Sequence, residues 1–278
     1  MSGPRIGLAL GGGSARGLAH IPMLEVFDEL GLKPTMIAGC SIGALIGAGY
    51  AAGMSAADIR ARAEMLLKNR YQAMRYVFGS KRTRLRDILA LKGLGSLQIK
   101  GEKLVGLAMP DDLPGNIEDL GIPFKVITTD LDAREEHVIS SGSLVTAVAA
   151  SLAIPGVIVA PRIDGRVHVD GGVTNPVPFN HVRGHCDIIV AIDVTGRPRP
   201  PVRTHHSNRE LAVSSLLIMF HQVAKLRRAA NPPDIYIEPA IAGFRGVDFF
   251  KLTELFEASQ PSKEQLKRAL DFRINQVA

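Results

Sequence analysis

One stretch of the sequence decides the fold, Met36-Ile37-Ala38-Gly39-Cys40-Ser41-Ile42-Gly43-Ala44-Leu45. The pattern predicts a buried strand that ends at Ala38, a sharp turn at Ser41 and a tightly packed helix. Gly39 and Gly43 are expected there because the serine backbone is strained and neighbouring backbone passes close by. Such a turn exposes the serine hydroxyl at the carboxyl end of a strand, beside the N–H groups of a helix N-terminus. Gly-x-Ser-x-Gly alone is also an ordinary glycine-rich turn, so a nucleophilic role depends on the rest of the chain.

Composition indicates a globular protein with an affinity for anions. The chain has 278 residues, of which 46% are hydrophobic and 22% charged, enough for one large α/β domain and incompatible with wholesale disorder. The net charge of +6 favours anionic partners without choosing among lipid head groups, nucleic acid and acidic metabolites. Trp is absent and only 5% of residues are aromatic, which argues against single-stranded nucleic-acid binding. The two cysteines, Cys40 and Cys186, form neither a disulfide framework nor a metal-binding pattern.

The sequence predicts a cytoplasmic protein. Residues Met1 to Leu10 carry one Arg followed by a short apolar strand, which is not the pattern of a signal peptide. No uninterrupted apolar run reaches the roughly 18 residues of a membrane span. A peripheral contact with a membrane stays open.

A glycine-rich loop follows the first predicted strand, Ile6–Leu10, and precedes a helix over about Ala19–Leu30. The loop reads Gly11-Gly12-Gly13-Ser14-Ala15-Arg16-Gly17, which suggests either a nucleotide phosphate cradle or an oxyanion hole. A dinucleotide site needs a second glycine where Ser14 stands and an acidic residue after the next strand, and a P-loop needs a Lys-[Ser/Thr] pair. An oxyanion hole needs only N–H groups turned toward one point, each worth roughly 10²–10³ in rate. Arg16 is expected to brace this loop through an ion pair rather than to meet a lipid phosphate.

A basic segment between Arg60 and Arg86 is predicted to be a helical insertion. It contains nine basic residues and one acid, Glu64, with apolar residues between them. The basic residues are Arg60, Arg62, Lys68, Arg70, Arg75, Lys81, Arg82, Arg84 and Arg86. A cap over the site, a surface that meets anionic membrane and a solvated helix face all fit this pattern. Gly and Pro between Gly93 and Gly115 then predict loops.

The second half of the chain alternates strands and helices without an internal repeat. Strands are predicted over Phe124–Thr129, Asp187–Asp193 and Asp234–Glu238, helices over Leu144–Ala153 and Leu211–Arg228, and two more helices at the end. A hairpin with an Asp-Gly turn, Arg162–Val169, leads into Asp170-Gly171-Gly172. Gly196–His206 is rich in Pro and Arg and is expected to be a mobile loop.

Five motifs occur in one order: the loop Gly11–Gly17, Gly39–Gly43, Ala150–Pro155, Asp170-Gly171-Gly172 and Gly172–Pro178. With them the chain closely resembles the patatin-like phospholipases, above all their short bacterial members. The resemblance implies a serine hydrolase with a Ser–Asp dyad, in which Ser41 is the nucleophile and Asp170 the base. It also implies an oxyanion hole from Gly12, Gly13 and Ser14, supported by Gly11, Arg16, Gly17, Gly39, Gly43, Gly171 and Gly172. Ser14 departs from the glycine that many members have there.

The resemblance sets the expectations for the whole chain. The fold should be three-layer α/β, with a mostly parallel sheet flanked by helices, a catalytic core over residues 6–195 and a C-terminal extension over 196–278 packed on the same domain. The activity should be hydrolysis of lipid carboxylic esters through an acyl-enzyme, with no metal, no cofactor and no catalytic histidine among the eight. An acyltransferase and a lipid-binding or regulatory protein with little turnover stay as alternatives. Head group, acyl chain and oligomeric state stay open.

Overall fold

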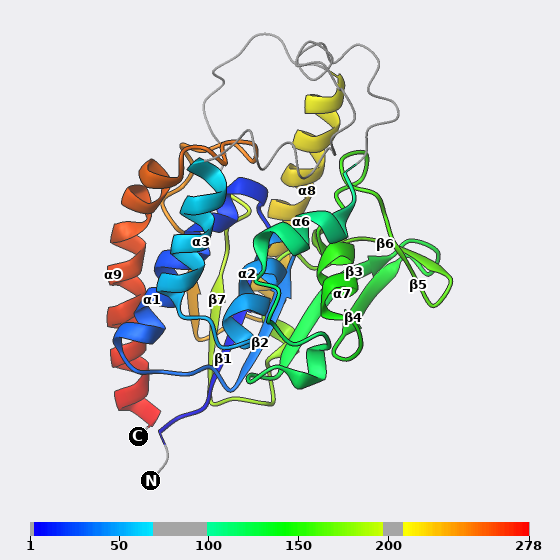
Figure 1. Ribbon diagram of the computed structural model, residues 1–278. Helices are drawn as coiled ribbons and strands as arrows, with labels where there is room; N and C mark the ends of the chain where they lie inside the picture. The colour runs from blue at the N-terminus through cyan, green and yellow to red at the C-terminus, as the bar shows by residue number, and fades with distance from the viewer. Residues whose placement is uncertain (1–2, 69–98, 197–207, 278) are drawn as a thin grey trace.

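The central sheet organises the molecule, in a computed structural model that describes residues 3–68, 99–196 and 208–277. Eight strands lie in the order β5-β6-β3-β2-β1-β7-β8, and β4 also pairs with β3 (Figure 1). Their bounds are β1 Ile6–Leu10, β2 Met36–Cys40, β3 Phe124–Asp130, β4 Glu135–Ile139, β5 Arg162–Ile163, β6 Arg166–Asp170, β7 Ile188–Ile192 and β8 Ile235–Ile237.

The middle of the sheet is parallel and apolar. Strands β3, β2, β1, β7 and β8 form a parallel series, whereas β4 and β6 pair antiparallel with β3, and β5 pairs antiparallel with β6. Every residue of β1 and β7 is buried, as continuous apolar runs in a sheet covered on both faces should be. The predicted mostly parallel α/β sheet flanked by helices is therefore confirmed.

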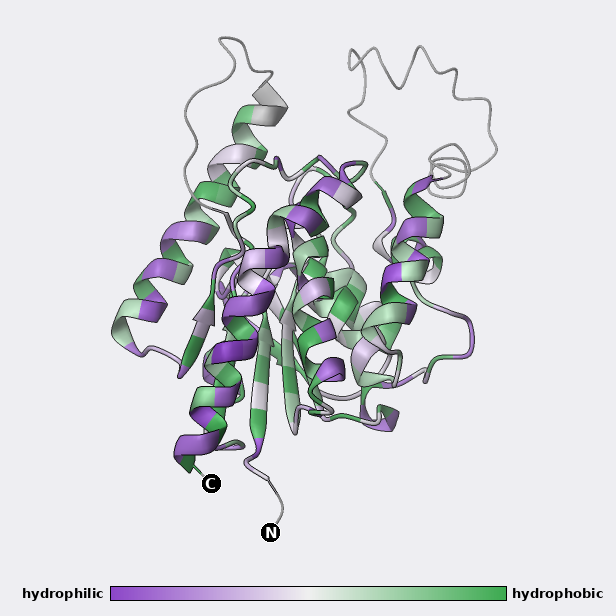
Figure 2. Ribbon diagram, turned by 90° about the vertical axis from the view of Figure 1, so that its left-hand side faces the viewer, coloured by the Kyte–Doolittle hydropathy of each residue, from purple (hydrophilic) through white to green (hydrophobic). Residues whose placement is uncertain are grey.

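Helices cover both faces of the sheet. The described α-helices are α1 His20–Glu29, α2 Ile42–Ala51, α3 Ala56–Lys68, α6 Gly101–Ala108, α7 Leu144–Ser151, α8 Asn208–Ala230 and α9 Leu252–Val277. Short 3₁₀ helices are formed by Ser14–Ala19, Ile117–Asp119, Gly171–Val173 and Phe179–His181. Figures 1 and 2 show α8 on one side of the sheet and α1, α2, α3, α6 and α7 on the other. In Figure 2 the hydrophobic colour prevails in the strands at the centre of the molecule, while α8 and α9 alternate between hydrophilic and hydrophobic. None of these helices has the length and apolar character that a membrane span requires.

The C-terminal part of the chain completes the same sheet and core. Strand β8 pairs with β7, and α9 packs against α1 and β8. Leu255, Leu266 and Leu270 of α9 are fully buried in the hydrophobic cluster that contains the strands β1 and β2.

Several predicted elements differ from the observed ones. Strand β2 runs to Cys40, two residues past its predicted end. The helix α6 lies within the stretch predicted to be loops, because its glycines stand at the helix start and inside it rather than as breaks. One helix, α9, replaces the two predicted at the end, since Pro261 is accommodated inside it. Strand β4 was not predicted. Most of the basic segment and of the loop Gly196–His206 lies outside the described residues.

The ends of β2 and β6 meet head to head on one side of β3. In β2, Cys40 pairs with Ile127 of β3, and in β6, Asp170 pairs with the next residue, Thr128. Strand β4 pairs with β3 along all of Val126–Asp130, so it occupies the other side. Strand β6 therefore pairs with β3 on the same side as β2, beyond the end of β2, and runs in the opposite direction. The residues that follow β2 face the last residue of β6.

Candidate active site

Ser41 sits on a strained turn between β2 and α2. Its backbone has φ 54° and ψ −124°, a conformation that non-glycine residues rarely adopt. The turn is tight because α2 starts against the end of β1, where a Cβ on Gly43 would lie 2.2 Å from the Leu10 carbonyl oxygen. A Cβ on Gly39 would lie 2.6 Å from the Ala44 Cα. Both glycines of the motif thus permit close backbone approach, and the strain falls on the serine.

Ser41 and Asp170 are in direct contact, although 129 positions separate them. The Ser41 Oγ donates a hydrogen bond to Asp170 Oδ2 at 2.7 Å, and both side chains are buried. The other carboxylate oxygen, Oδ1, accepts the Gly172 N–H at 2.8 Å and lies 4.0 Å from the Cys40 Sγ. A hydroxyl bonded to a carboxylate in a buried site is the arrangement that activates a serine nucleophile.

Burial sets the protonation of Asp170. Desolvation raises the pKa of Asp170 from 3.8 to about 6, against the lowering effect of the hydrogen bonds from Gly172 and Ser41. A free aspartate is a poor base at neutral pH, and a carboxylate of higher pKa is a better one. The site can therefore accept the serine proton near neutral pH.

Ser151 supports the nucleophile and was not predicted as a site residue. The Ser41 N–H donates to the Ser151 Oγ at 2.7 Å, and that hydroxyl donates to the Ile127 carbonyl at 2.6 Å. This relay ties the strained turn to β3 through the end of α7. The signal lay in the motif Ala150–Pro155, which carries one polar residue among small apolar ones.

The glycine-rich loop lies beside Ser41, but its three predicted oxyanion donors are not equivalent. The Gly12 N–H donates to the Pro176 carbonyl at 2.8 Å, so in this structure it already has an acceptor. A Cβ on Gly12 would lie 3.2 Å from the Ser41 Cβ, which shows that it lines the nucleophile instead. The Gly13 and Ser14 N–H groups have no hydrogen-bond acceptor among the described residues. Ser14 adopts φ 54°, and its hydroxyl donates to the Gly246 carbonyl at 2.6 Å.

The remaining predicted residues pack around these groups. The Gly11 N–H donates to the Ile192 carbonyl at 3.0 Å. A Cβ on Gly17 would collide with Ile42, one on Gly171 with the Ile127 carbonyl, and one on Gly172 with the Phe220 ring. Arg16 is buried, with its guanidinium against Gly196, which favours bracing of the loop over contact with a lipid phosphate.

None of the histidines within the described ranges hydrogen-bonds to Ser41 or Asp170. His20 binds the Gly11 carbonyl through Nε2 at 2.8 Å, and burial lowers its pKa to about 4, so it is neutral at pH 7. His168 and His221 bind Thr128 and Thr195, and His181 binds Glu136. His205 and His206 lie outside the described residues. Within those ranges no group of three or more His, Cys, Asp or Glu side chains could hold a metal ion.

The fold and this geometry define a class, an α/β protein with a buried Ser–Asp pair on a nucleophile elbow and a glycine loop beside it. The sequence model of the patatin-like phospholipases matches residues 8–183, and the chain belongs to that family.

Relatives cover different shares of the chain. An uncharacterized NTE family protein of Mycobacterium tuberculosis is 33% identical over 213 residues, which cover 74% of this chain and 54% of that protein. Lysophospholipase nte1 of Aspergillus fumigatus is 25% identical over 311 residues, 97% of this chain but 18% of that protein. The chain thus spans about half or less of these curated relatives. The crystal structure of VipD from Legionella pneumophila shares the fold, with a TM-score of 0.50 and 15% identity over 97% of this chain and 67% of that one.

Proposed function

We propose that the protein hydrolyses carboxylic ester bonds of lipids with Ser41 as the nucleophile and Asp170 as the base. The observation that carries this proposal is the 2.7 Å hydrogen bond from the Ser41 Oγ to the buried carboxylate of Asp170. Membership of the patatin-like phospholipase family supports lipid esters as the substrate class. Because a relative over nearly the whole chain is named a lysophospholipase, lysophospholipids are the first substrates to test.

The geometry supports a two-step mechanism. Asp170 accepts the hydroxyl proton as the Ser41 Oγ attacks the ester carbonyl carbon, and a tetrahedral intermediate forms. Its collapse breaks the bond to the alcohol, which leaves with the proton held by Asp170, and the acyl group stays on Ser41. Asp170 then takes a proton from water, whose oxygen attacks the acyl-enzyme, and the fatty acid departs as the proton returns to Ser41.

The oxyanion is proposed to be stabilised by a revised set of donors. The Gly13 and Ser14 N–H groups remain from the predicted three, because the Gly12 N–H already has an acceptor. The Ile42 N–H joins them, since it belongs to the residue after the nucleophile and to the first turn of α2, where N–H groups lack helical acceptors. Backbone donors fixed by a packed loop cost no reorganisation when the charge develops.

The decisive experiment compares Ser41→Ala, Asp170→Asn and the double variant in hydrolysis of lysophospholipids and of a chromogenic ester. Each single variant should lose about 10⁴-fold in kcat, and the double variant should be hardly worse, because either change disables the same unit. Ser143→Ala and Asp164→Asn make the same substitutions at exposed positions and should retain activity. A folded Ser41→Ala variant with wild-type turnover would exclude Ser41 as the nucleophile.

We further propose a single domain and a peripheral contact with anionic membrane. The pairing of β8 with β7 supports the single domain. We exclude Arg60 and Arg62 from the proposed membrane-binding surface, because both are engaged within the protein. Arg60 pairs with Glu25, and Arg62 donates to the carbonyls of Leu107, Ala108 and Met109. Six of the nine basic residues lie in 69–86, outside the described residues, and Lys68 is exposed.

A further inference from the structure

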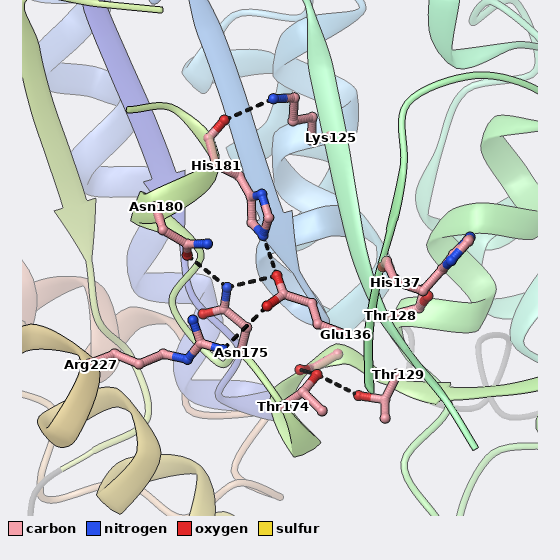
Figure 3. A network of polar contacts seen from close by, with 11 residues as sticks. Lys125, Thr128, Thr129, Glu136, His137, Thr174, Asn175, Asn180, His181 and Arg227 are labelled. Atoms are coloured by element: carbon pink, nitrogen blue, oxygen red, sulfur yellow. Dashed lines mark hydrogen bonds and ion pairs between the residues drawn. The ribbon is translucent and has the colours of Figure 1, made fainter. Parts of the chain in front are cut away.

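A polar network lies on the face of the sheet that α8 covers, centred on Glu136 of β4 (Figure 3). Its Oε1 accepts a hydrogen bond from Asn175 Nδ2 at 2.9 Å and contacts His181 Nε2. Its Oε2 accepts from Arg227 of α8 at 3.2 Å. Asn175 Nδ2 also donates to the Asn180 Oδ1 at 2.8 Å. The carboxylate of Glu136 thus connects a loop and the helix α8 to β4, the strand that pairs with β3.

The segment Asp170–Pro178, here called the base loop, joins this network to the active site. Asn175 donates its backbone N–H to the Gly171 carbonyl at 2.8 Å, directly after the base. The next residue, Pro176, offers the carbonyl that accepts the Gly12 N–H. A displacement of Asn175 would therefore move two things together. One is the turn that carries Asp170, and the other is the Pro176 carbonyl that holds the glycine loop through Gly12.

The contact between Glu136 and Asn175 is difficult to replace with water. Asn175 is fully buried, and its Oδ1 has no hydrogen-bond partner among the described residues, so the side chain is held through Nδ2. Without Glu136 the Nδ2 group would keep only the Asn180 Oδ1, at a position where burial excludes water as a replacement. Burial raises the pKa of Glu136, but the bonds from His181 and Asn175 and the charge of Arg227 outweigh it and leave the pKa below its usual value. Glu136 is therefore ionised at neutral pH.

We propose that Glu136 is a positioning residue, which holds Asn175 and thereby fixes the base loop in its active geometry. This inference rests on the proposed function of Ser41 and Asp170. Loss of the contact lets the base loop shift, which misaligns the base and loosens the glycine loop, and both of these act in the chemical step. We expect the effect to appear in kcat, since a displacement of a catalytic group by about 1 Å costs up to about 100-fold in rate.

The test compares Glu136→Gln, Asn175→Asp and the double variant with wild type. Each single variant should lower kcat for the chromogenic ester about 10- to 100-fold and leave KM within about twofold. In Glu136→Gln the single side-chain oxygen cannot accept from both Asn175 and Arg227, and in Asn175→Asp two facing carboxylates repel each other. The double variant reverses the polarity of the contact, because the Gln amide can donate to the new carboxylate, and it should recover at least tenfold in kcat over either single variant. The rate of Ser41 labelling by a fluorophosphonate should follow the same order.

Glu25→Gln is the matched control. The Glu25 side chain is 18% exposed, as is that of Glu136, and it also binds two basic side chains, Arg60 and Lys263, but at α1 on the other face of the sheet. It should keep kcat within about twofold. Melting temperatures are measured for every variant, and assays run well below the lowest.

Two results would overturn the proposal: a Glu136→Gln variant as active as Glu25→Gln, or a double variant no better than the single ones. If Asn175→Asp does not fold, the comparison of Glu136→Gln with Glu25→Gln decides alone. If Ser41→Ala also keeps full activity, the failure lies in the proposed function instead.

Discussion

The proposed role of Asp170 as the base predicts that the activity depends on pH. Only the ionised carboxylate can take the serine proton, and burial raises its pKa to about 6. We expect kcat/KM to be constant above pH 7 and to fall about tenfold per pH unit below pH 6. A pH–rate profile of the wild-type enzyme measures this limb. A profile that stays flat down to pH 4.5 would contradict a base with a raised pKa.

The same pKa predicts that the base weakens the fold. Because the folded pKa is raised, the folded state binds the proton more tightly, and the stability this provides is lost as pH rises from 3.8 to about 6. A difference of about two in pKa corresponds to about 3 kcal/mol. Asp170→Asn should therefore be inactive yet more stable than wild type by about 3 kcal/mol at pH 8, and little different at pH 3.5. Urea unfolding at both pH values measures it, with Ser41→Ala, which keeps the carboxylate, following wild type.

At the residue scale, the sequence predicted the groups marked by local pattern and missed those defined by distant partners. Ser41 and Asp170 each stand in a short glycine motif that follows a strand. Glu136 acts through a residue 39 positions away, and nothing beside it in the sequence indicates that contact. Ser151 contacts a residue 110 positions away, and its only signal was its place in the motif Ala150–Pro155. The loss of Gly12 as a donor has the same origin, because its acceptor is 164 positions away (176 − 12).

At the element scale, catalytic groups of an α/β sheet usually meet because the carboxyl ends of parallel strands share one edge. Ser41 and Asp170 meet for another reason. Strand β6 is antiparallel to β3 and ends against β2, so the meeting point is a head-to-head junction of two strands. Alternation and apolar runs predict that a strand exists, whereas its direction depends on pairing that a single sequence does not encode locally. Strand β4 is partly exposed and begins with two glutamates, so it has neither an apolar run nor a clear alternation, and only its pairing with β3 makes it a strand.

The junction also depends on how closely α2 approaches β1. In Gly43→Ala the new Cβ would lie 2.2 Å from the Leu10 carbonyl oxygen, so helix and strand must separate and move Ser41. We expect a loss of about 3 kcal/mol in the free energy of unfolding and loss of activity. In Gly49→Ala, on the same helix, the nearest atom to the new Cβ is the Met54 Sδ at 3.2 Å, and a flexible thioether can shift, while the Ile59 side chain at 3.8 Å is in ordinary contact. That variant should stay within about 1 kcal/mol of wild type, and similar losses from both would contradict the close approach.

At the scale of the whole molecule, much of the positive charge is used internally in the described part of the chain. Arg60 stacks on Phe256 and pairs with Glu25, and Lys263 joins that carboxylate from α9. Arg227 and Arg228 bind Glu136 and Glu238. Composition alone counts these charges as available to an anionic partner, because pairing depends on the fold. The net charge of +6 is therefore a poor measure of the unpaired basic side chains that these regions could offer to an anionic membrane.

The remaining basic residues of the segment are the ones expected to bind anionic membrane. Arg82→Ser with Arg84→Ser should weaken binding to vesicles of anionic phospholipid, whereas Lys33→Ser with Lys267→Ser removes the same charge elsewhere and should matter less. Binding by exposed charges should also fall with salt, since the Debye length shrinks from ~10 Å at 0.1 M to ~3 Å at 1 M. Sedimentation with neutral and anionic vesicles measures both effects. If the two double variants bind equally, or if binding is the same for neutral vesicles or at both salt concentrations, the membrane proposal fails while the hydrolytic one stands, because the ester assay in solution needs no membrane.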